Sequence, residues 1–416
     1  MLKVPLIVKR ELSNGEQIEV GKLAENKQGT FFQYTSEYLA RFSDSLAPFN
    51  LAADTSLQKA PSLPHFGLHG LFADSLPDGW GLYLMDRMFR QNGYDPKQIT
   101  ALERLAYLSQ QGAGSLSYEP ALPLVDINEV ETIDFITLGK NAIQEFEGTE
   151  TDILAQLVQA SGSGGARPKL NVTQLQNGLF TTDTKQKGTQ FIIKLTSKKF
   201  PLQQYESLIE YAYMTMAKNL QLDVPKFQLF QVDTDHFWLQ QQRFDRTDNG
   251  KLHMISAAGL LDASFREPSL DYLELLKATR ILCGIKEGQN LIKRALFNFL
   301  TLNQDDHAKN FAFLMDDDNN WKLSPFYDIV YSPSPYQEHM TAFAGNGKHP
   351  YHALPKFAQL AGFTSTKPLW QILEEIYQQT LIFRQEALHL GISKRLVTEI
   401  AKQIDQRWAW RKIYSE

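Results

Sequence analysis

The 416-residue sequence has little cysteine, no long apolar run and little net charge, and each shortage excludes a class of protein. The single cysteine, Cys283, lies in the apolar run 281–283, so no internal disulfide can form and we expect a small core residue in a reducing compartment. No apolar run approaches the roughly 20 residues that span a bilayer. Charges interrupt the apolar N-terminus within a few residues, unlike a signal peptide. A net charge of −5 gives no general attraction to nucleic acid or acidic membranes. The sequence therefore predicts a cytoplasmic protein.

The sequence instead contains two halves with different patterns. A hydrophobic share of 43% and a charged share of 21% are typical of globular proteins, and the length allows two or three domains. Short strand-like runs with Asn-Gly and Gln-Gly turns dominate the first half. After Arg246 the pattern is mostly helical, except for a segment at 302–355 that contains a hairpin with strands near 311–313 and 321–323.

These patterns give a division of the chain. Acidic, irregular sequence at 126–151 predicts a connector between an N-terminal unit and the rest. Helical spacing of apolar residues predicts helices at 80–90, 99–109 and 206–220. The predicted parts are an N-terminal β-rich subdomain with helices (1–115), a connector (116–150), a β-rich lobe (151–245) and a helical lobe (246–416).

One short stretch holds the groups that phosphoryl transfer requires. Asp305 is followed five residues later by Asn310, and Asp328 comes eighteen residues after that. A kinase needs a base for the nucleophile and two oxygen ligands for magnesium, and its catalytic loop places Asp and Asn at this spacing. Asp306 is a rival for the base, and His307 is either a metal ligand or a hydrogen-bonded structural group. Asp and Asn also crowd ordinary turns, so this pattern alone is weak.

A Gly-rich loop precedes the first strand of the second β region. Gly164 and Gly165 can lay backbone N–H groups against phosphates, with Lys169 close behind. The spacing is not that of a Walker A loop, and a flexible connector explains the glycines equally well. Ser161 and Ser163 in this loop are candidate phosphorylation sites, although loop serines are usually only solvated.

Lys194 interrupts the apolar strand 191–195, where a buried lysine is costly unless it is paired. A nucleotide phosphate and a carboxylate of the next helix, Glu206 or Glu210, would pair it. The alternative is a lysine on an edge strand whose ammonium reaches water. Residues 242–244 end a strand where the two halves meet, and either bind adenine through their backbone or form an ordinary linker.

These features occur in the same order as in protein kinases. Their sequences also resemble those of the HipA family, the kinase toxins of bacterial type II toxin–antitoxin modules. The resemblance extends over nearly the whole chain. The matching stretches are 76–81 (Leu-Pro-Asp-Gly-Trp-Gly), 164–169 (Gly-Gly-Ala-Arg-Pro-Lys), 193–195 (Ile-Lys-Leu), Glu210 with 216–218 (Met-Ala-Lys), 243–246 (Arg-Phe-Asp-Arg), 303–311 (Asn-Gln-Asp-Asp-His-Ala-Lys-Asn-Phe) and 327–329 (Tyr-Asp-Ile).

The resemblance implies an α+β, protein-kinase-like fold of two lobes, with an extra N-terminal β subdomain and an all-helical C-terminal lobe. It implies a serine/threonine kinase that uses ATP and Mg²⁺. Asp305 would be the catalytic base, and Asn310 and Asp328 would bind the metal. Lys194 would bind phosphate, and Glu210 would be the helix glutamate that pairs with it. The implied ATP-binding residues are Gly164, Gly165, Ala166, Arg167, Pro168, Lys169, Lys194, Gln242, Arg243, Phe244, Asp245 and His307.

The resemblance also implies partners and regulation. Family members act on translation-related proteins such as aminoacyl-tRNA synthetases, and a small helix-turn-helix antitoxin holds them, so that DNA is contacted only through that antitoxin. Autophosphorylation of the Gly-rich loop is expected at Ser161 or Ser163, because the usual serine position is Gly162 here. A catalytically silent binding protein and a small-molecule kinase are the alternatives. The latter leaves no place for the N-terminal subdomain.

Overall fold

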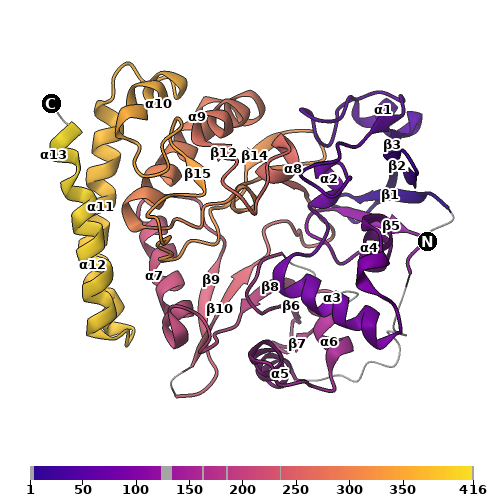
Figure 1. The fold of residues 1–416 in the computed structure, drawn as a ribbon, viewed down its shortest axis with the longest axis horizontal. Coiled ribbons are helices and arrows are strands. Elements are labelled where there is room, and N and C mark those ends of the chain that lie inside the picture. Colours follow the sequence, from indigo (N-terminus) through magenta and orange to yellow (C-terminus); the bar gives the residue numbers. More distant parts are fainter. Residues whose placement is uncertain (1–3, 123–133, 162–163, 184–185, 235, 415–416) are drawn as a thin grey trace.

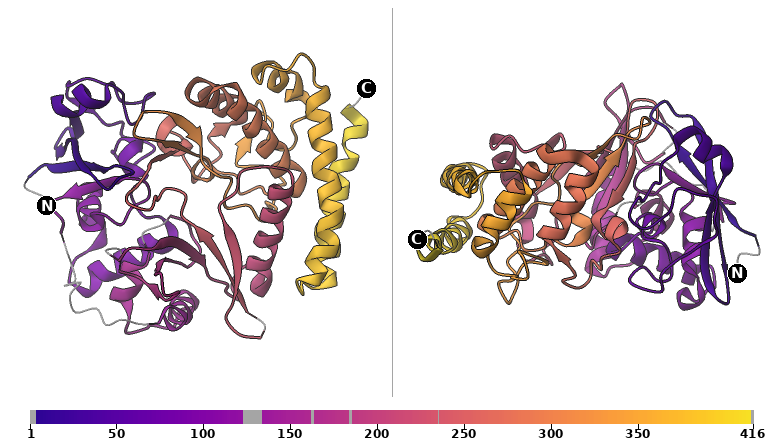
Figure 2. Two further views of the ribbon diagram at one scale, coloured as in Figure 1. Left: turned by 180° about the vertical axis from the view of Figure 1, so that it is seen from behind. Right: turned by 90° about the horizontal axis from the view of Figure 1, so that it is seen from above.

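The computed structural model describes residues 4–122, 134–161, 164–183, 186–234 and 236–414, and its parts follow one another across the molecule in sequence order (Figure 1). The N-terminal subdomain lies at one end and the helices α11–α13 lie at the other (Figure 2). Between them are a β-rich lobe and the remainder of a largely helical lobe. The predicted α+β, two-lobed architecture is confirmed.

The N-terminal subdomain is an antiparallel sheet of five strands in the order β4-β3-β2-β1-β5. Alternation along β1 turns Leu6, Val8 and Arg10 to the buried face. Arg10 is fully buried, and its Nη2 donates to the carbonyl of Asp316, 2.9 Å away in the second half of the chain. The elements are β1 (Leu6–Glu11), β2 (Gln17–Asn26), β3 (Gly29–Tyr34), α1 (Ser36–Phe42), β4 (Gln58–Lys59), α2 (Gly70–Ala73), α3 (Gly79–Gln91), η1 (Pro96–Gln98), α4 (Ala101–Leu108) and β5 (Leu116–Glu119).

The β-rich lobe has a second antiparallel sheet, in the order β7-β6-β8-β10-β9. Its central strand, β8, carries Lys194 between Lys169 of β6 and Leu239 of β10, so the edge-strand alternative for Lys194 is wrong. The elements are β6 (Lys169–Gln174), β7 (Phe180–Thr181), β8 (Thr189–Lys194), η3 (Gln203–Tyr205), α7 (Glu206–Asn219), β9 (Phe227–Gln231) and β10 (Phe237–Gln242).

Helices cover both faces of this sheet. Helix α7 packs on the face that carries Lys194, and the other face packs on α5 (Phe135–Glu147) and α6 (Leu154–Gln159). Helix α5 corrects the expectation of irregular sequence at 126–151 over residues 135–147, whereas residues 126–133 lie outside the described residues. Asp134 caps its first turn through the amides of residues 136 and 137, and Gly148 ends it in a left-handed conformation.

The C-terminal lobe is not all-helical, and this detail of the prediction is wrong. The buried strand β13 must satisfy its backbone groups, and it does so between β11 and β14, where the expected hairpin is confirmed. Gly284, at φ +85°, interrupts the long helix α9. The elements are β11 (His253–Ser256), α8 (Ala257–Leu261), β12 (Leu270–Asp271), α9 (Tyr272–Thr301), η4 (Ala308–Asn310), β13 (Ala312–Met315), β14 (Trp321–Leu323), β15 (Thr341–Ala342), η5 (Tyr351–Ala353), α10 (Leu354–Leu360), α11 (Lys367–His389), α12 (Lys394–Ala409) and α13 (Arg411–Tyr414). Within the described residues, no helix is both long and apolar enough to cross a membrane.

Candidate active site

Lys194 joins the two lobes. Its Nζ lies 2.5 Å from Oε1 of Glu210 on α7 and 2.6 Å from Oδ1 of Asp328 in the helical lobe. Gln241 on the neighbouring strand donates a hydrogen bond of 3.0 Å to the same Glu210 oxygen. Burial opposes the charged form of Lys194, but Asp328 and Glu210 outweigh burial and raise its pKa. The structure thus brings Lys194, Glu210 and Asp328 together, and it pairs Lys194 with Glu210 rather than with Glu206.

Asp328 and Asn310 offer oxygen atoms on the helical side of this cluster. Burial disfavours the Asp328 carboxylate, yet Lys194, Lys169 and Arg167 together lower its pKa, so it is ionised at neutral pH. Nδ2 of Asn310 donates to the carbonyl of Asp305 at 2.7 Å, which leaves Oδ1 of Asn310 free of that bond. One carboxylate and one amide oxygen match the donor preference of Mg²⁺, which commonly uses one or two protein oxygens together with phosphates. No group of three or more His, Cys, Asp or Glu side chains able to hold a metal occurs among the residues described.

The adjacent residues Asp305 and Asp306 have opposite surroundings. The side chain of Asp305 reaches solvent, although partial burial desolvates it and raises its pKa. His307 opposes this shift and Asp328 reinforces it. Asp306 is buried. Its carboxylate accepts hydrogen bonds from the Tyr272 hydroxyl at 2.7 Å, from the Met340 amide at 2.9 Å and from the Thr341 amide at 3.3 Å, and it lies 2.9 Å from Nδ1 of His339.

The Gly-rich loop lies against the start of β6. Nζ of Lys169 donates to the carbonyl of Gly164, and burial lowers the pKa of this lysine while Asp328 opposes the shift. Nη1 of Arg167 lies 2.6 Å from Oε1 of Glu206. Burial raises the pKa of Glu206 to about 7, although Arg167 acts in the opposite direction.

The two predicted phosphate acceptors in the loop differ in what the structure describes. Ser161 is buried at the end of α6, where its hydroxyl donates to the carbonyl of Val158 at 2.9 Å. Ser163 and its neighbour Gly162 lie outside the described residues. In this conformation Ser161 is therefore shielded from solvent.

Residues 242–245 have mixed roles. The ring of Phe244 packs 5.4 Å from that of Tyr327, next to Asp328. The side chains of Arg243 and Asp245 instead pair with each other at 2.8 Å, and Asp245 accepts the amide of Gly114 from the N-terminal subdomain. Both side chains therefore serve the contact between subdomain and lobe. The amides of residues 242 and 243 donate to the carbonyls of Lys226 and Gln190, so these two amides are also engaged within the lobe.

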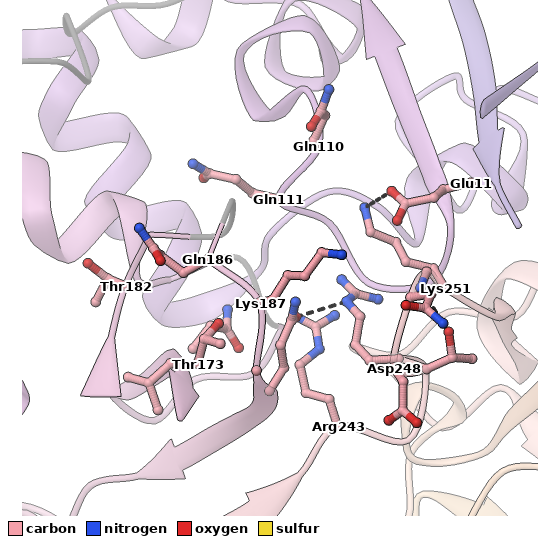
Figure 3. A pocket seen from close by; sticks show the side chains of 18 of the residues that line it. Glu11, Gln110, Gln111, Thr173, Thr182, Gln186, Lys187, Arg243, Asp248 and Lys251 are labelled. Carbon is pink, nitrogen blue, oxygen red and sulfur yellow. Dashed lines mark hydrogen bonds and ion pairs between the residues drawn. The ribbon is translucent and has the colours of Figure 1, made fainter. Parts of the chain in front are cut away.

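A polar cavity of about 260 Å³ lies beside this segment, between the N-terminal subdomain and the β-rich lobe. Gln110 and Gln111 reach it from one side and Lys187 and Arg243 from the other (Figure 3). Its residues lie toward the Gln190 end of β8, about 13 Å along the strand from Lys194 at 3.3 Å per residue. The cavity is thus separate from the Lys194 cluster.

Two models of one family match this chain. The HipA-like C-terminal domain matches residues 161–407, and the HipA N-terminal domain matches residues 15–119. The chain belongs to the HipA family. The C-terminal match contains Lys194, Glu210, Asp305, Asn310 and Asp328.

A solved complex supports the HipA fold across the whole chain. The complex of Shewanella oneidensis HipA, HipB and operator DNA contains a chain with 18% identity and a TM-score of 0.69, and the match covers 97% of this chain and 96% of that one. At this identity the likeness shows the fold.

Two curated relatives share part of the sequence. "Putative kinase Y4dM" of Sinorhizobium fredii is 30% identical over 39% of this chain, and "Putative kinase" of Haemophilus influenzae is 25% identical over 50%. The matches span 42% and 64% of those proteins, which is less than two thirds of either.

Two site residues of this HipA-family chain were missed in the sequence. Gln241 supports Glu210, as described above, and Asp78 binds the Gly-rich loop from the N-terminal subdomain: its Oδ1 accepts the amide of Gly165. Asp78 lies in the 76–81 motif, which supported the family resemblance but predicted no site residue. Pro-Asp-Gly before a helix is also an ordinary turn and N-cap pattern, so no signal in the sequence distinguished Asp78 as part of the site.

Proposed function

We propose that this chain is an ATP- and Mg²⁺-dependent serine/threonine protein kinase that acts as the toxin of a HipA-type toxin–antitoxin module. The observation that carries the proposal is the bridge of Lys194 to Glu210 and Asp328, together with the exposed Asp305, which interacts electrostatically with Asp328. A kinase requires a strand lysine paired with a helix glutamate, together with a metal-binding carboxylate in the other lobe. The separate sequence elements that predicted these groups support the same conclusion.

Each residue has a role in this proposal. Bound ATP would supply the phosphoryl group, and Mg²⁺ would neutralise part of the phosphate charge. Asp305 accepts the proton of the attacking serine or threonine hydroxyl, and the raised pKa of Asp305 makes it a stronger base than a free carboxylate. Lys194 orients the phosphates, while Asn310 and Asp328 would hold the metal. The Gly-rich loop would cover the phosphates with its backbone amides.

The partners belong to the same proposal. The family resemblance supports a translation-related protein target, such as an aminoacyl-tRNA synthetase. The Shewanella oneidensis complex, which contains HipB and operator DNA, supports an antitoxin partner and DNA contact only through it. Incubation with ATP should add phosphate to the Gly-rich loop, detected by intact mass and peptide mapping at Ser161 or Ser163. Ser161 would have to leave its buried position first.

The first test compares two matched substitutions. Asp305→Asn should lower the rate of Mg²⁺-dependent phosphate transfer by roughly 10²–10⁴-fold, the usual contribution of a general base, without changing the melting temperature. Asp306→Asn should lower the melting temperature, because it weakens a buried hydrogen-bonded carboxylate, at a cost of about 1–3 kcal/mol. The folded Asp306→Asn protein should keep its activity.

The reverse pattern would show that the base is Asp306. A wild-type protein that transfers no phosphate from ATP would instead favour a binding protein over a kinase. Growth arrest on expression, lost in Asp305→Asn, is the expected result in cells. Normal growth with active protein would contradict the toxin role.

A further inference from the structure

Asp78 immediately precedes helix α3 and occupies its N-cap position, yet its carboxylate accepts no hydrogen bond from that helix in the described chain. An N-cap aspartate ordinarily binds the first free amides of its own helix. Here one oxygen accepts the amide of Gly165 in the Gly-rich loop, and the other lies 2.8 Å from Nζ of Lys309 in the catalytic loop. A single carboxylate of the N-terminal subdomain thus joins both loops of the candidate active site.

The backbone around Asp78 is built for this contact. Gly79 adopts φ +44°, and a Cβ placed on it would lie 2.4 Å from Cα of Ala166. The amide of Trp80 donates to the carbonyl of Gly165 at 3.0 Å. The start of α3 and the Gly-rich loop therefore touch backbone to backbone, and a side chain at position 79 would push them apart.

Charge favours the same arrangement. Asp78 is only 7% exposed, and burial opposes its ionisation, but Lys309, the Gly165 amide and Lys169 together lower its pKa. The carboxylate is therefore charged at neutral pH, and its bonds to both loops are charge-assisted. Lys309 adjoins Asn310 in the chain, so a shift of Lys309 also displaces a proposed metal ligand.

We propose that Asp78 is a positioning residue for phosphoryl transfer, which holds Gly165 and Lys309 together so that the N-terminal subdomain completes the phosphate end of the active site. This inference rests on the proposed kinase function. Asp78 touches no reacting atom and acts through the two loops that it joins. The N-terminal subdomain then contributes directly to catalytic geometry as well as to the interface between domains.

The test uses the full chain with Asp78→Asn, which keeps the side-chain shape and removes the charge. Hydrogen exchange of the peptide that spans 164–169 should become faster, since the Gly165 amide loses a charged acceptor. The kcat should fall roughly 10–100-fold, the usual effect of small misplacements in an active site, and KM for ATP should rise less. The affinity for a fluorescent ATP analogue, measured without turnover, should fall as well.

Two further variants make the result specific. Lys309→Met breaks the same ion pair from the other side, and combining it with Asp78→Asn should give a loss of activity smaller than the product of the two single losses. Asp86→Asn removes an equal charge from α3, where Asp86 lies 2.6 Å from Arg104, and should leave exchange of 164–169 and kcat unchanged.

Each outcome decides one question. Unchanged exchange and unchanged kcat in Asp78→Asn would overturn the proposal, and a higher kcat would show that Asp78 blocks the loops rather than positions them. Faster exchange in an enzyme whose wild type transfers no phosphate would refute the kinase function while retaining the bridge. Equal losses of kcat in Asp86→Asn and Asp78→Asn would show that both substitutions act through the general stability of the fold.

Discussion

At the scale of residues, the two aspartates at the start of the catalytic loop show what sequence spacing can and cannot provide. The five-residue step to Asn310 selected Asp305 as the predicted base, with Asp306 as its rival. The hydrogen bonds to the buried carboxylate of Asp306 come from residues 272 and 339–341, which are more than 30 positions away in either direction. No local pattern contains that information, so the structural surroundings of Asp306 could not be predicted.

Glu206 gives a pH-dependent prediction at the same scale. Its pKa in the folded protein is about 7, mainly because of burial, whereas an unfolded glutamate titrates near 4.3. The folded state thus prefers protonated Glu206, and the associated stability is complete below about pH 4 and is lost as the pH rises through about 7. The melting temperature of Glu206→Gln should therefore fall less than that of the wild type as the pH rises from 5 to 8.

Thermal unfolding of both proteins at several pH values between 5 and 8 measures this difference. Glu210→Gln is unsuitable as the control because Glu210 contacts Lys194 in the candidate active site, so exposed Glu150→Gln serves instead. A Glu206→Gln protein with the wild-type pH dependence would contradict the prediction.

At the scale of elements, strands β8 and β13–β14 and helix α7 were predictable, because their signals are local runs or periodic spacings of apolar residues. Helix α5 was not, because the acidic, irregular sequence at 126–151 is typical of a connector, and Gly139 has a low helix propensity. The structure supplies the reason for that glycine: a Cβ at position 139 would lie 2.2 Å from the ring of Trp238. Contact with the sheet, rather than local propensity, determines this residue.

Gly139→Ala tests that contact. Alanine should stabilise the helix itself by up to about 1 kcal/mol, but overpacking against Trp238 should cost about 1–3 kcal/mol, so the net effect should be a loss of stability. Urea unfolding followed by tryptophan fluorescence measures the change. Lys140→Ala on the exposed side of α5 should change stability by less than about 0.5 kcal/mol. A stabilised Gly139→Ala would mean that α5 does not pack tightly on β10.

At the scale of the whole molecule, contacts between distant segments hold the N-terminal subdomain to the lobes. Arg243 and Arg246 both pair with Asp245, and Arg246 also donates to the carbonyls of Gly112 and Gly114. The segment 242–244 was predicted to bind adenine because it ends a strand at the junction of the halves. Its main visible task is to anchor the subdomain, which follows from burial and could not be deduced from its position in the chain.

Asp245→Asn should therefore weaken the subdomain contact. It leaves two buried arginines without their shared counter-ion, which typically costs about 3–5 kcal/mol. We expect a lower melting temperature or a separate early unfolding step in calorimetry. Exposed Asp248→Asn, three residues away, should unfold like wild type. An unchanged transition in Asp245→Asn would show that other contacts dominate the interface.

The contacts of the buried Arg10 affect the order of folding during synthesis. Its guanidinium binds the carbonyl of Asp316 and lies 3.5 Å from the carboxylate of Asp317, a residue 307 positions later in the chain. A ribosome that adds about 5–20 residues per second needs roughly 15–60 s to make that acceptor after Arg10 itself. Until then the partners of Arg10 in the N-terminal subdomain are the hydroxyl of Tyr38 and the ring of Phe42, and its charge lacks the carboxylate of Asp317. The first sheet to leave the ribosome therefore completes its contacts only after residues 316 and 317 of the second lobe have been translated.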